Sequence, residues 1–222
     1  MVSKVLGFPT VWHIREIMPA SRFSPLRAFI RYAVGRCASV GICVSKSVHK
    51  DINITGNITI IYDGIPVERF LESPDTDSIR QELGIGSQTG SVAFIGQIKP
   101  GKGLETYLRA AAIVAEERPD TKFFIVGGEV LTDSYKASFP RRILRLLSPA
   151  DYEETIKKLA EKLNVSDRVR FTGFLENIAP TLAAMDIIVI PSRCEPFGRV
   201  AVEAMAMKKA VVASDAGGLR LS

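Results

Sequence analysis

Short apolar runs alternate with longer amphipathic stretches along most of the chain. Continuous apolar runs between turn residues are typical of parallel strands buried on both faces, and apolar residues recurring every three or four positions are typical of helices. The pattern predicts strands at 91–95, 122–126, 168–172, 186–190 and 210–213 and helices from 104 onward, at 152–163 and after 198. Because each strand ends at glycine or a small polar turn, this alternation predicts an α/β fold with a doubly wound parallel sheet.

The first part of the chain follows its own pattern. It predicts strands at 10–13, 40–44 and 57–62, a helix at 26–37, and a turn at Asp63-Gly64-Ile65-Pro66. We therefore expect residues 1–70 to be the end of one domain and residues 71–222 to form another.

Two glutamates, Glu195 and Glu203, follow the apolar strand 186–190 and have seven residues between them. Glu195 falls in the loop after the strand, and Glu203 is expected about two turns into the next helix. The free N–H groups and the dipole at a helix N-terminus favour a diphosphate, and Gly198 would let a ligand approach the backbone closely. An ionised glutamate has two acceptor oxygens for a vicinal diol. The arrangement therefore predicts a nucleotide-sugar site.

A glycine-bearing loop, residues 96–103, follows the predicted strand 91–95 and carries Lys99 and Lys102. Open parallel sheets bind ligands at the carboxyl ends of their strands. A lysine ammonium there makes a strong point-charge contact with a diphosphate, although most lysines only solvate a loop.

The segment 186–218 resembles the donor-site signature of the retaining glycosyltransferases of family 4. The matching residues are Glu195, Pro196, Phe197, Gly198, Glu203, Ala204, Met205, Ala206, Val211, Val212, Gly217 and Gly218. The resemblance extends over most of the chain and implies the GT-B fold of two Rossmann-like domains. It also implies a hexosyltransferase-type enzyme that uses a nucleoside-diphosphate sugar, with retention, in glycan, lipopolysaccharide or glycolipid synthesis.

The resemblance also implies roles for single residues. Glu195 would lie at the reacting sugar, Glu203 at the ribose and Lys102 at the diphosphate. Gln97 stands where the family often has arginine, so stabilisation of the leaving group would rest on Lys102 and the helix N-terminus, with Lys99 as a further candidate. His13 matches a histidine that approaches the donor sugar, but a histidine near a strand end is also an ordinary packing residue. The expected catalytic residues are Glu195, Lys102 and His13, and the expected donor-binding residues are Gly96, Gln97, Lys102, Phe197, Gly198 and Glu203.

Simpler interpretations exist for both glutamates. Glu203 could be a solvated helix residue, and Glu195 could be a first-turn acid favoured by the helix dipole. A complete two-domain enzyme would need roughly twice one ~150-residue domain, so we expect the 222 residues to be a fragment covering the end of one domain and most of the next. A catalytically impaired nucleotide-binding fragment, a regulatory pseudoenzyme, or an epimerase or phosphorylase on the same architecture remain alternatives.

The net charge is +5, and three arginines lie among apolar residues at 139–147, FPRRILRLL. A basic amphipathic helix of this kind can lie on an anionic membrane, which would suit a lipid-linked acceptor, although packing on the core is the commoner case. The expected partners are a nucleotide-sugar donor and a glycan or lipid-linked acceptor. No nucleic-acid module is visible, so no nucleic acid is expected.

The cysteines Cys37, Cys43 and Cys194 lack metal-ligand spacing, and the chain has two histidines. Asp75 and Asp77 form an Asp-x-Asp pair before a predicted helix, where capping is the expected role. We therefore expect no metal and no cofactor beyond the donor substrate. Without a signal peptide or long apolar span, the expected location is the cytoplasm, with peripheral attachment to the inner membrane face as an alternative.

Overall fold

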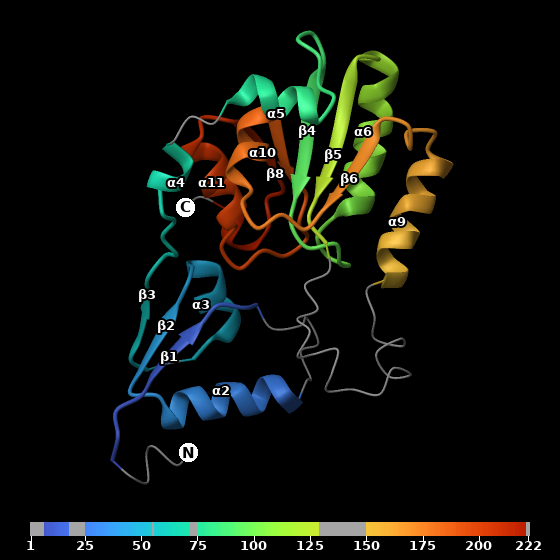
Figure 1. Ribbon diagram of the computed structural model, residues 1–222. Helices are drawn as coiled ribbons and strands as arrows, with labels where there is room; N and C mark the ends of the chain where they lie inside the picture. The colour runs from blue at the N-terminus through green and yellow to red at the C-terminus, as the bar shows by residue number, and fades with distance from the viewer. Residues whose placement is uncertain (1–6, 18–24, 55, 72–74, 129–149, 221–222) are drawn as a thin grey trace. The chain divides into compact units, whose positions relative to one another are not determined.

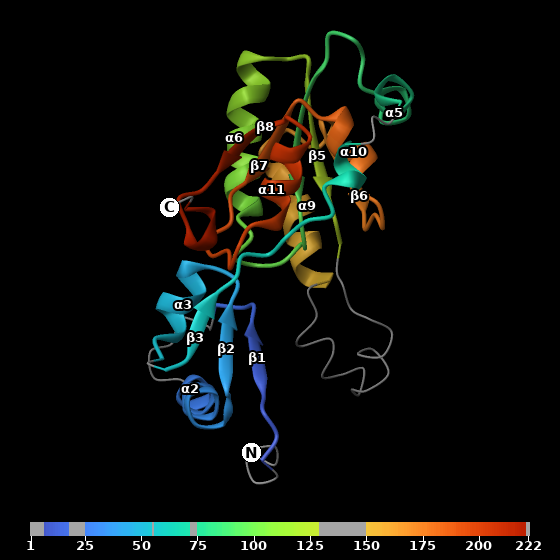
Figure 2. The same cartoon turned by 90° about the vertical axis from the view of Figure 1, so that its left-hand side faces the viewer.

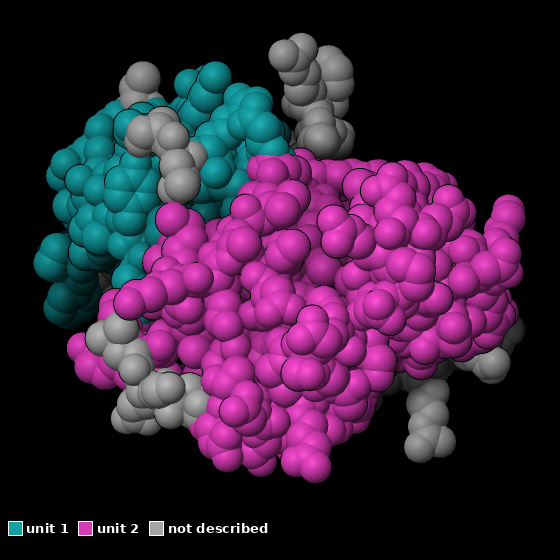
Figure 3. Space-filling view, turned by 90° about the horizontal axis from the view of Figure 1, so that it is seen from above, with its two compact units in different colours: residues 1–65, 194–199, 215–222 teal, residues 66–193, 200–214 magenta. Residues whose placement is uncertain are grey.

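The computed structural model describes residues 7–17, 25–54, 56–71, 75–128 and 150–220. The chain divides into two compact units, coloured separately in Figure 3. Unit 1 comprises Met1–Ile65, Cys194–Arg199 and Asp215–Ser222, and unit 2 comprises Pro66–Arg193 and Val200–Ser214. Unit 1 therefore includes two short segments from the C-terminal part of the chain.

Unit 2 is built on a five-stranded sheet in the order β6-β5-β4-β7-β8, with every neighbouring pair parallel (Figure 1). This order, with the first strand of the unit in the centre, confirms the predicted parallel α/β fold. The strands are β4 (Gly90–Ile95), β5 (Thr121–Val126), β6 (Val169–Gly173), β7 (Ile187–Ile190) and β8 (Ala210–Ala213).

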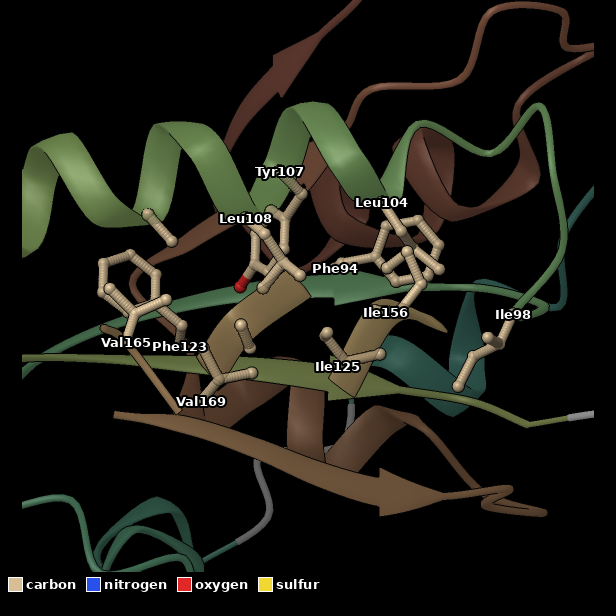
Figure 4. Packing of buried hydrophobic residues seen from close by; sticks show 12 residues of the cluster. Phe94, Ile98, Leu104, Tyr107, Leu108, Phe123, Ile125, Ile156, Val165 and Val169 are labelled. Atoms are coloured by element: carbon tan, nitrogen blue, oxygen red, sulfur yellow. The ribbon is translucent and has the colours of Figure 1, made fainter. Parts of the chain in front are cut away.

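Helices cover both faces of this sheet. The helix α6 (Leu104–Glu117) lies on one face, while α5 (Thr76–Glu82) and α10 (Ala179–Ala184) lie on the other (Figure 2). The helix α9 (Ala150–Lys162) packs beside α6, and their apolar side chains meet those of β4, β5 and β6 (Figure 4). Successive strand residues point to opposite faces, so Phe123 and Ile125 enter this cluster while Phe124, also fully buried, faces the other side. Burial on both faces explains the unbroken apolar runs in the sequence.

Side-chain hydrogen bonds connect the elements at the N-terminal ends of the strands, which we call the N-terminal edge of the sheet. Arg80 of α5 donates to the carbonyl oxygens of Ala184 at 2.8 Å and Thr89 at 2.9 Å. Asp186, just before β7, accepts from the backbone N–H of Ser91 at 2.8 Å and from its hydroxyl at 2.7 Å. These bonds tie α5, β4 and β7 together at the end of the sheet where the strands begin.

Unit 1 contains a parallel three-stranded sheet in the order β1-β2-β3. Its core joins Val34, Cys43, Val44, Val48 and Ile52, with Phe197 packed against it. The elements of the unit are β1 (Val11–Ile14), α2 (Pro25–Cys37), β2 (Val40–Cys43), α3 (Lys46–Ile52), β3 (Ile58–Ile60) and the 3-10 turn η1 (Gly217–Leu219). A shared core shows that α2 and α3 cover the same face of this sheet.

The predicted strands and helices lie close to the observed ones. The strand 210–213 matches β8 residue for residue, and the other described strands differ from the prediction by one or two residues at one or both ends. The capping role of Asp75 is confirmed, because its carboxylate accepts from the Ser78 N–H at 3.2 Å at the start of α5. The short helix α4 (Glu68–Leu71), α3 and α10 were not predicted. The basic segment 139–147 lies outside the described residues.

Candidate active site

The loop that carries Lys102 packs tightly on the chain that follows β7. Gly103 adopts a left-handed conformation (φ 78°) just before α6, and a Cβ added to it would lie 1.9 Å from the Pro191 carbonyl oxygen. The Arg193 N–H donates to the Gly101 carbonyl at 2.9 Å. The half-buried Lys102 therefore lies between two glycines where the ends of β4 and β7 adjoin.

Gly96 and Gln97, the other two residues of this loop that are predicted to bind the donor, differ in their surroundings. The Gly96 N–H donates to the Val126 carbonyl at 2.9 Å, and a Cβ on Gly127 would lie 1.9 Å from the Gly96 carbonyl oxygen. Gly96 therefore joins the ends of β4 and β5. Gln97 is exposed, whereas the next side chain, Ile98, is buried and fixes the loop to the core.

Glu203 lies slightly more than one turn into α11 (Arg199–Ala206), not two turns as expected. Only 6% of the residue is exposed, so the interpretation of Glu203 as a solvated helix residue is wrong. Carboxylates are rarely buried without a partner, and Glu203 makes polar contacts within the structure. Its place, in the helix after β7, agrees with the sequence prediction.

Glu195 precedes α11 by four residues, and the first turn of that helix contains no acidic residue. The interpretation of Glu195 as a first-turn acid is therefore wrong. Its carbonyl oxygen accepts from the Gly218 N–H at 2.6 Å, and a Cβ on Gly217 would lie 2.3 Å from the same oxygen. The glycine pair Gly217-Gly218 thus contacts the backbone of residues 194–198, the loop before α11 that we call the glutamate loop. Cys194, next to Glu195, is exposed.

Gly198 has a structural reason to be glycine. Its φ of 91° disfavours side chains, and an added Cβ would lie 2.5 Å from the Leu219 side chain and 3.6 Å from that of Glu195. The space expected for a ligand next to this Cα is filled by Leu219. A ligand contact with Gly198 would therefore involve its backbone groups from another direction.

Phe197 and Pro196 connect the glutamate loop to the rest of unit 1. The Phe197 ring lies 6.1 Å from the Tyr62 ring, centroid to centroid, and packs against the core. The Ser45 hydroxyl donates to the Pro196 carbonyl at 2.5 Å. Sequence reasoning missed Ser45, although a serine before a helix is a known capping signal.

His13 is exposed on β1, with Ile42 as its partner in the parallel register with β2. The predicted residues are divided between the units. Unit 1 contains His13, Glu195, Phe197 and Gly198, and unit 2 contains Gly96, Gln97, Lys102 and Glu203. The structure brings Glu195, Phe197 and Gly198 together on one loop.

Unit 2 also contains a polar pair that the sequence did not reveal. Burial, and after it the neighbouring Glu105 carboxylate, raise the pKa of the Tyr152 hydroxyl.

Among the described residues, no group of three or more histidine, cysteine or acidic side chains could hold a metal ion. Within the same residues, no helix is long and apolar enough to cross a membrane.

A family model described as glycosyl transferases group 1 matches residues 75–221, which is more than half of the chain. The chain belongs to the group 1 glycosyltransferases. The match begins at the start of α5 and takes in both glutamates, Lys102 and the glycine pair.

Curated relatives of the chain include D-inositol 3-phosphate glycosyltransferases. The one from Streptomyces avermitilis is 31% identical over 166 residues, and the match covers 74% of this chain and 33% of the relative. The one from Mycolicibacterium vanbaalenii is 34% identical over 164 residues, covering 73% of this chain and 34% of the relative. The chain thus spans about a third of the length of these relatives.

Solved structures extend the similarity to almost the whole chain. Anabaena Alr3699/HepE in complex with UDP-glucose has a TM-score of 0.83 and 27% identity, over 98% of this chain and 56% of that one. Sucrose-phosphate synthase from Thermosynechococcus elongatus has a TM-score of 0.76 and 26% identity, over 96% of this chain and 52% of that one. WaaG, a glycosyltransferase of lipopolysaccharide biosynthesis, has a TM-score of 0.73 at 22% identity, over 96% of this chain and 58% of that one, and supports the GT-B fold alone.

Proposed function

We propose that this chain contributes the donor-binding part of a retaining glycosyltransferase of family 4. The reaction would transfer a hexose from a nucleoside-diphosphate sugar to an acceptor hydroxyl. The observation that carries the proposal is the buried Glu203 in the helix after β7, within the region that matches the family model. An ionised carboxylate has two acceptor oxygens, the type of group that sugar hydroxyls bind. HepE, with UDP-glucose bound, is 27% identical and supports the same class of donor.

Each residue has a proposed role. Glu203 accepts hydrogen bonds from the ribose, Lys102 neutralises the diphosphate, and Glu195 positions the donor sugar. Backbone groups of Phe197 and Gly198, with Gly96 and Gln97, complete the set of donor-binding residues. His13, exposed on β1, is proposed to approach the sugar during catalysis.

The proposed chemistry breaks the bond between the anomeric carbon and the diphosphate oxygen. The acceptor oxygen attacks from the leaving-group face and bonds to the anomeric carbon, so configuration is retained. Its proton passes to the departing diphosphate. Because negative charge grows on the diphosphate as positive charge grows on the sugar, Lys102 and the backbone N–H groups stabilise the transition state more than the ground state.

The wider setting belongs to the same proposal. The acceptor is a glycan or a lipid-linked molecule, and the reaction needs neither a metal ion nor a cofactor. The location is the cytoplasm or the inner face of a membrane.

An exposed Gln97 supports a second candidate function, a nucleotide-binding protein with impaired catalysis. The family often has an arginine at this position, and a neutral amide stabilises a departing diphosphate less than a guanidinium does. Such a protein would bind the nucleotide normally and transfer sugar slowly. Gln97→Arg would then raise turnover without changing nucleotide affinity.

Calorimetric titration of the chain with UDP, GDP and ADP tests the proposal. We expect one nucleotide to bind, and Glu203→Ala to weaken it about tenfold, the effect of removing a charged hydrogen bond of about 1.5 kcal/mol. Glu203→Gln keeps the size of the side chain and serves as the matched control for loss of charge alone. Unchanged affinity in Glu203→Ala would contradict the ribose assignment. Absence of binding by the folded, unmodified chain would contradict the proposed function.

A further inference from the structure

Ser45 is a buried residue at the point where β2 leads into α3, with 3% of its surface exposed. Its oxygen accepts a hydrogen bond from the Val48 N–H at 3.1 Å and thereby caps α3. The same hydroxyl donates to the Pro196 carbonyl at 2.5 Å. A hydroxyl has one proton to donate and lone pairs to accept, so both bonds can exist at once. Capping alone leaves the bond to Pro196 unexplained.

The bond to Pro196 acts on the next residue through the peptide group. The Pro196 C=O and the Phe197 N–H belong to one planar unit and point in opposite directions. Fixing the carbonyl oxygen therefore fixes the direction of the Phe197 N–H. A hydrogen bond at the oxygen also polarises the amide and makes its N–H a stronger donor.

Other contacts fix the neighbouring peptide groups of the same loop. The Gly218 N–H binds the Glu195 carbonyl at 2.6 Å, and a Cβ on Gly218 would lie 2.3 Å from the Pro196 oxygen. Only glycine leaves room for the approach of these backbones. Together with the Ser45 hydroxyl, Gly218 fixes two successive carbonyls, those of Glu195 and Pro196.

We propose that Ser45 is a positioning residue for donor binding. Through the Pro196 carbonyl it orients the Phe197 N–H, and with Gly218 it fixes the backbone from which the Glu195 side chain extends. This inference rests on the proposed function, since it assigns Ser45 to the same donor site. Ser45 acts through the loop and makes no contact of its own with the donor.

Three variants separate positioning from helix capping. Ser45→Ala removes both hydrogen bonds, and Ser45→Thr keeps the hydroxyl. Asn53→Ala is the matched control, because Asn53 ends α3 in a left-handed conformation (φ 45°). Alanine there strains the same helix at its other end and leaves Ser45 intact.

The measurements are the amide ¹H–¹⁵N resonance of Phe197 and calorimetric affinity for UDP, GDP and ADP, each made on the full 222-residue chain. We expect Ser45→Ala to move the Phe197 resonance and to weaken the nucleotide that binds about fivefold, the effect of one lost hydrogen bond. Ser45→Thr should restore both. Asn53→Ala should lower thermal stability while leaving the resonance and the affinity unchanged.

The outcomes separate this inference from the proposed function. If the unmodified chain binds a nucleotide and Ser45→Ala binds it equally well, the role of Ser45 is wrong and the proposed function stands. An unmoved Phe197 resonance in Ser45→Ala, or an equal loss of affinity in Asn53→Ala, also overturns the inference. If the unmodified chain binds none of the three nucleotides, the proposed function fails and the inference fails with it.

Discussion

The two edges of the unit 2 sheet lie at the N-terminal and the C-terminal ends of its strands. They are built from different interactions. At the N-terminal edge, side chains of Arg80, Ser91 and Asp186 bind one another and nearby carbonyl oxygens. At the C-terminal edge, the close contacts are between glycines and backbone, as at Gly103 against Pro191 and Gly127 against Gly96. The first edge is held mainly by side-chain hydrogen bonds, while glycines let β4 approach the ends of β5 and β7 closely at the second, where the Ser214 hydroxyl also binds the Ser192 carbonyl. We therefore expect substitutions at the N-terminal edge to affect stability alone and substitutions at the C-terminal edge to affect nucleotide binding as well.

The largest effect is expected from a methyl group at the C-terminal edge. In Gly103→Ala, the alanine would have to adopt the left-handed conformation of Gly103. Its Cβ would lie 1.9 Å from the Pro191 carbonyl oxygen, so the loop must move. We expect the free energy of unfolding to fall by about 3–4 kcal/mol and nucleotide binding to be lost. Urea denaturation and calorimetry measure the two effects.

Gly101→Ala is the matched control for this prediction. Gly101 also has a positive φ, 90°, but an added Cβ meets no atom within 4 Å among the described residues. We expect it to cost about 1 kcal/mol, the strain of the backbone alone. Equal effects of the two substitutions would show that the contact with Pro191 is unimportant.

The next largest effect is expected at the N-terminal edge. Arg80→Ala would remove the guanidinium donor from the carbonyl oxygens of Ala184 and Thr89 and should lower the free energy of unfolding by about 2–3 kcal/mol. Arg80→Lys should recover only part of this, because an ammonium lacks the planar fork of the guanidinium. Nucleotide affinity should not change in either variant. A loss of affinity matching that of Gly103→Ala would end the distinction between the edges.

Lys102→Ala should show the reverse of Arg80→Ala, with a loss of nucleotide affinity and little loss of stability. We expect nucleotide affinity to fall about tenfold, as for a lost charge-assisted hydrogen bond, while the free energy of unfolding changes by less than about 0.5 kcal/mol. Lys99→Ala removes an exposed lysine from the same loop and controls for the change in net charge. Equal losses of affinity in the two variants would assign the effect to general electrostatics instead of a specific contact.

The smallest effect concerns Tyr107, which lies between the edges. Its buried hydroxyl is 2.9 Å from the Val92 carbonyl and 3.1 Å from the Phe124 carbonyl, and burial raises its pKa above the ordinary value of 10.0. Tyr107→Phe should lower the free energy of unfolding by about 1 kcal/mol at neutral pH.

The pH dependence gives a further check on Tyr107. Above pH 10 the unfolded chain loses this proton before the folded chain does. The contribution of Tyr107 to the free energy of unfolding is therefore fully present below pH 10 and falls as the pH rises. Tyr107→Phe removes this contribution. Between pH 10 and 11 its free energy of unfolding should therefore fall less steeply than that of the unmodified protein. Parallel curves for the two proteins in urea denaturation would contradict the role of burial.

The sequence predicted strands better than contacts between distant segments. Apolar runs such as 91–95 mark buried strands because both faces of the sheet are covered there. The helix α10 was missed because six residues, five of them buried, give no amphipathic period to read. Local patterns therefore predict the secondary structure of a segment, but not which other segments pack against it.

The same reasoning explains the outcome for the candidate site. The spacing of Glu195 and Glu203 was visible, but the burial of Glu203 depends on packing around α11 and not on its local sequence. Ser45 and Pro196 are 151 residues apart, so no local pattern could link them. The positive φ of Gly198 was hidden too, because glycine is compatible with many conformations.

The positions of the three cysteines have a practical consequence. Cys37 and Cys43 are buried, while Cys194 is exposed and directly precedes Glu195. A thiol-reactive fluorophore should therefore label Cys194 selectively in the folded protein. The chain thus offers a natural attachment point for an optical probe next to the glutamate loop, and changes in that loop could be followed in real time without introducing a cysteine.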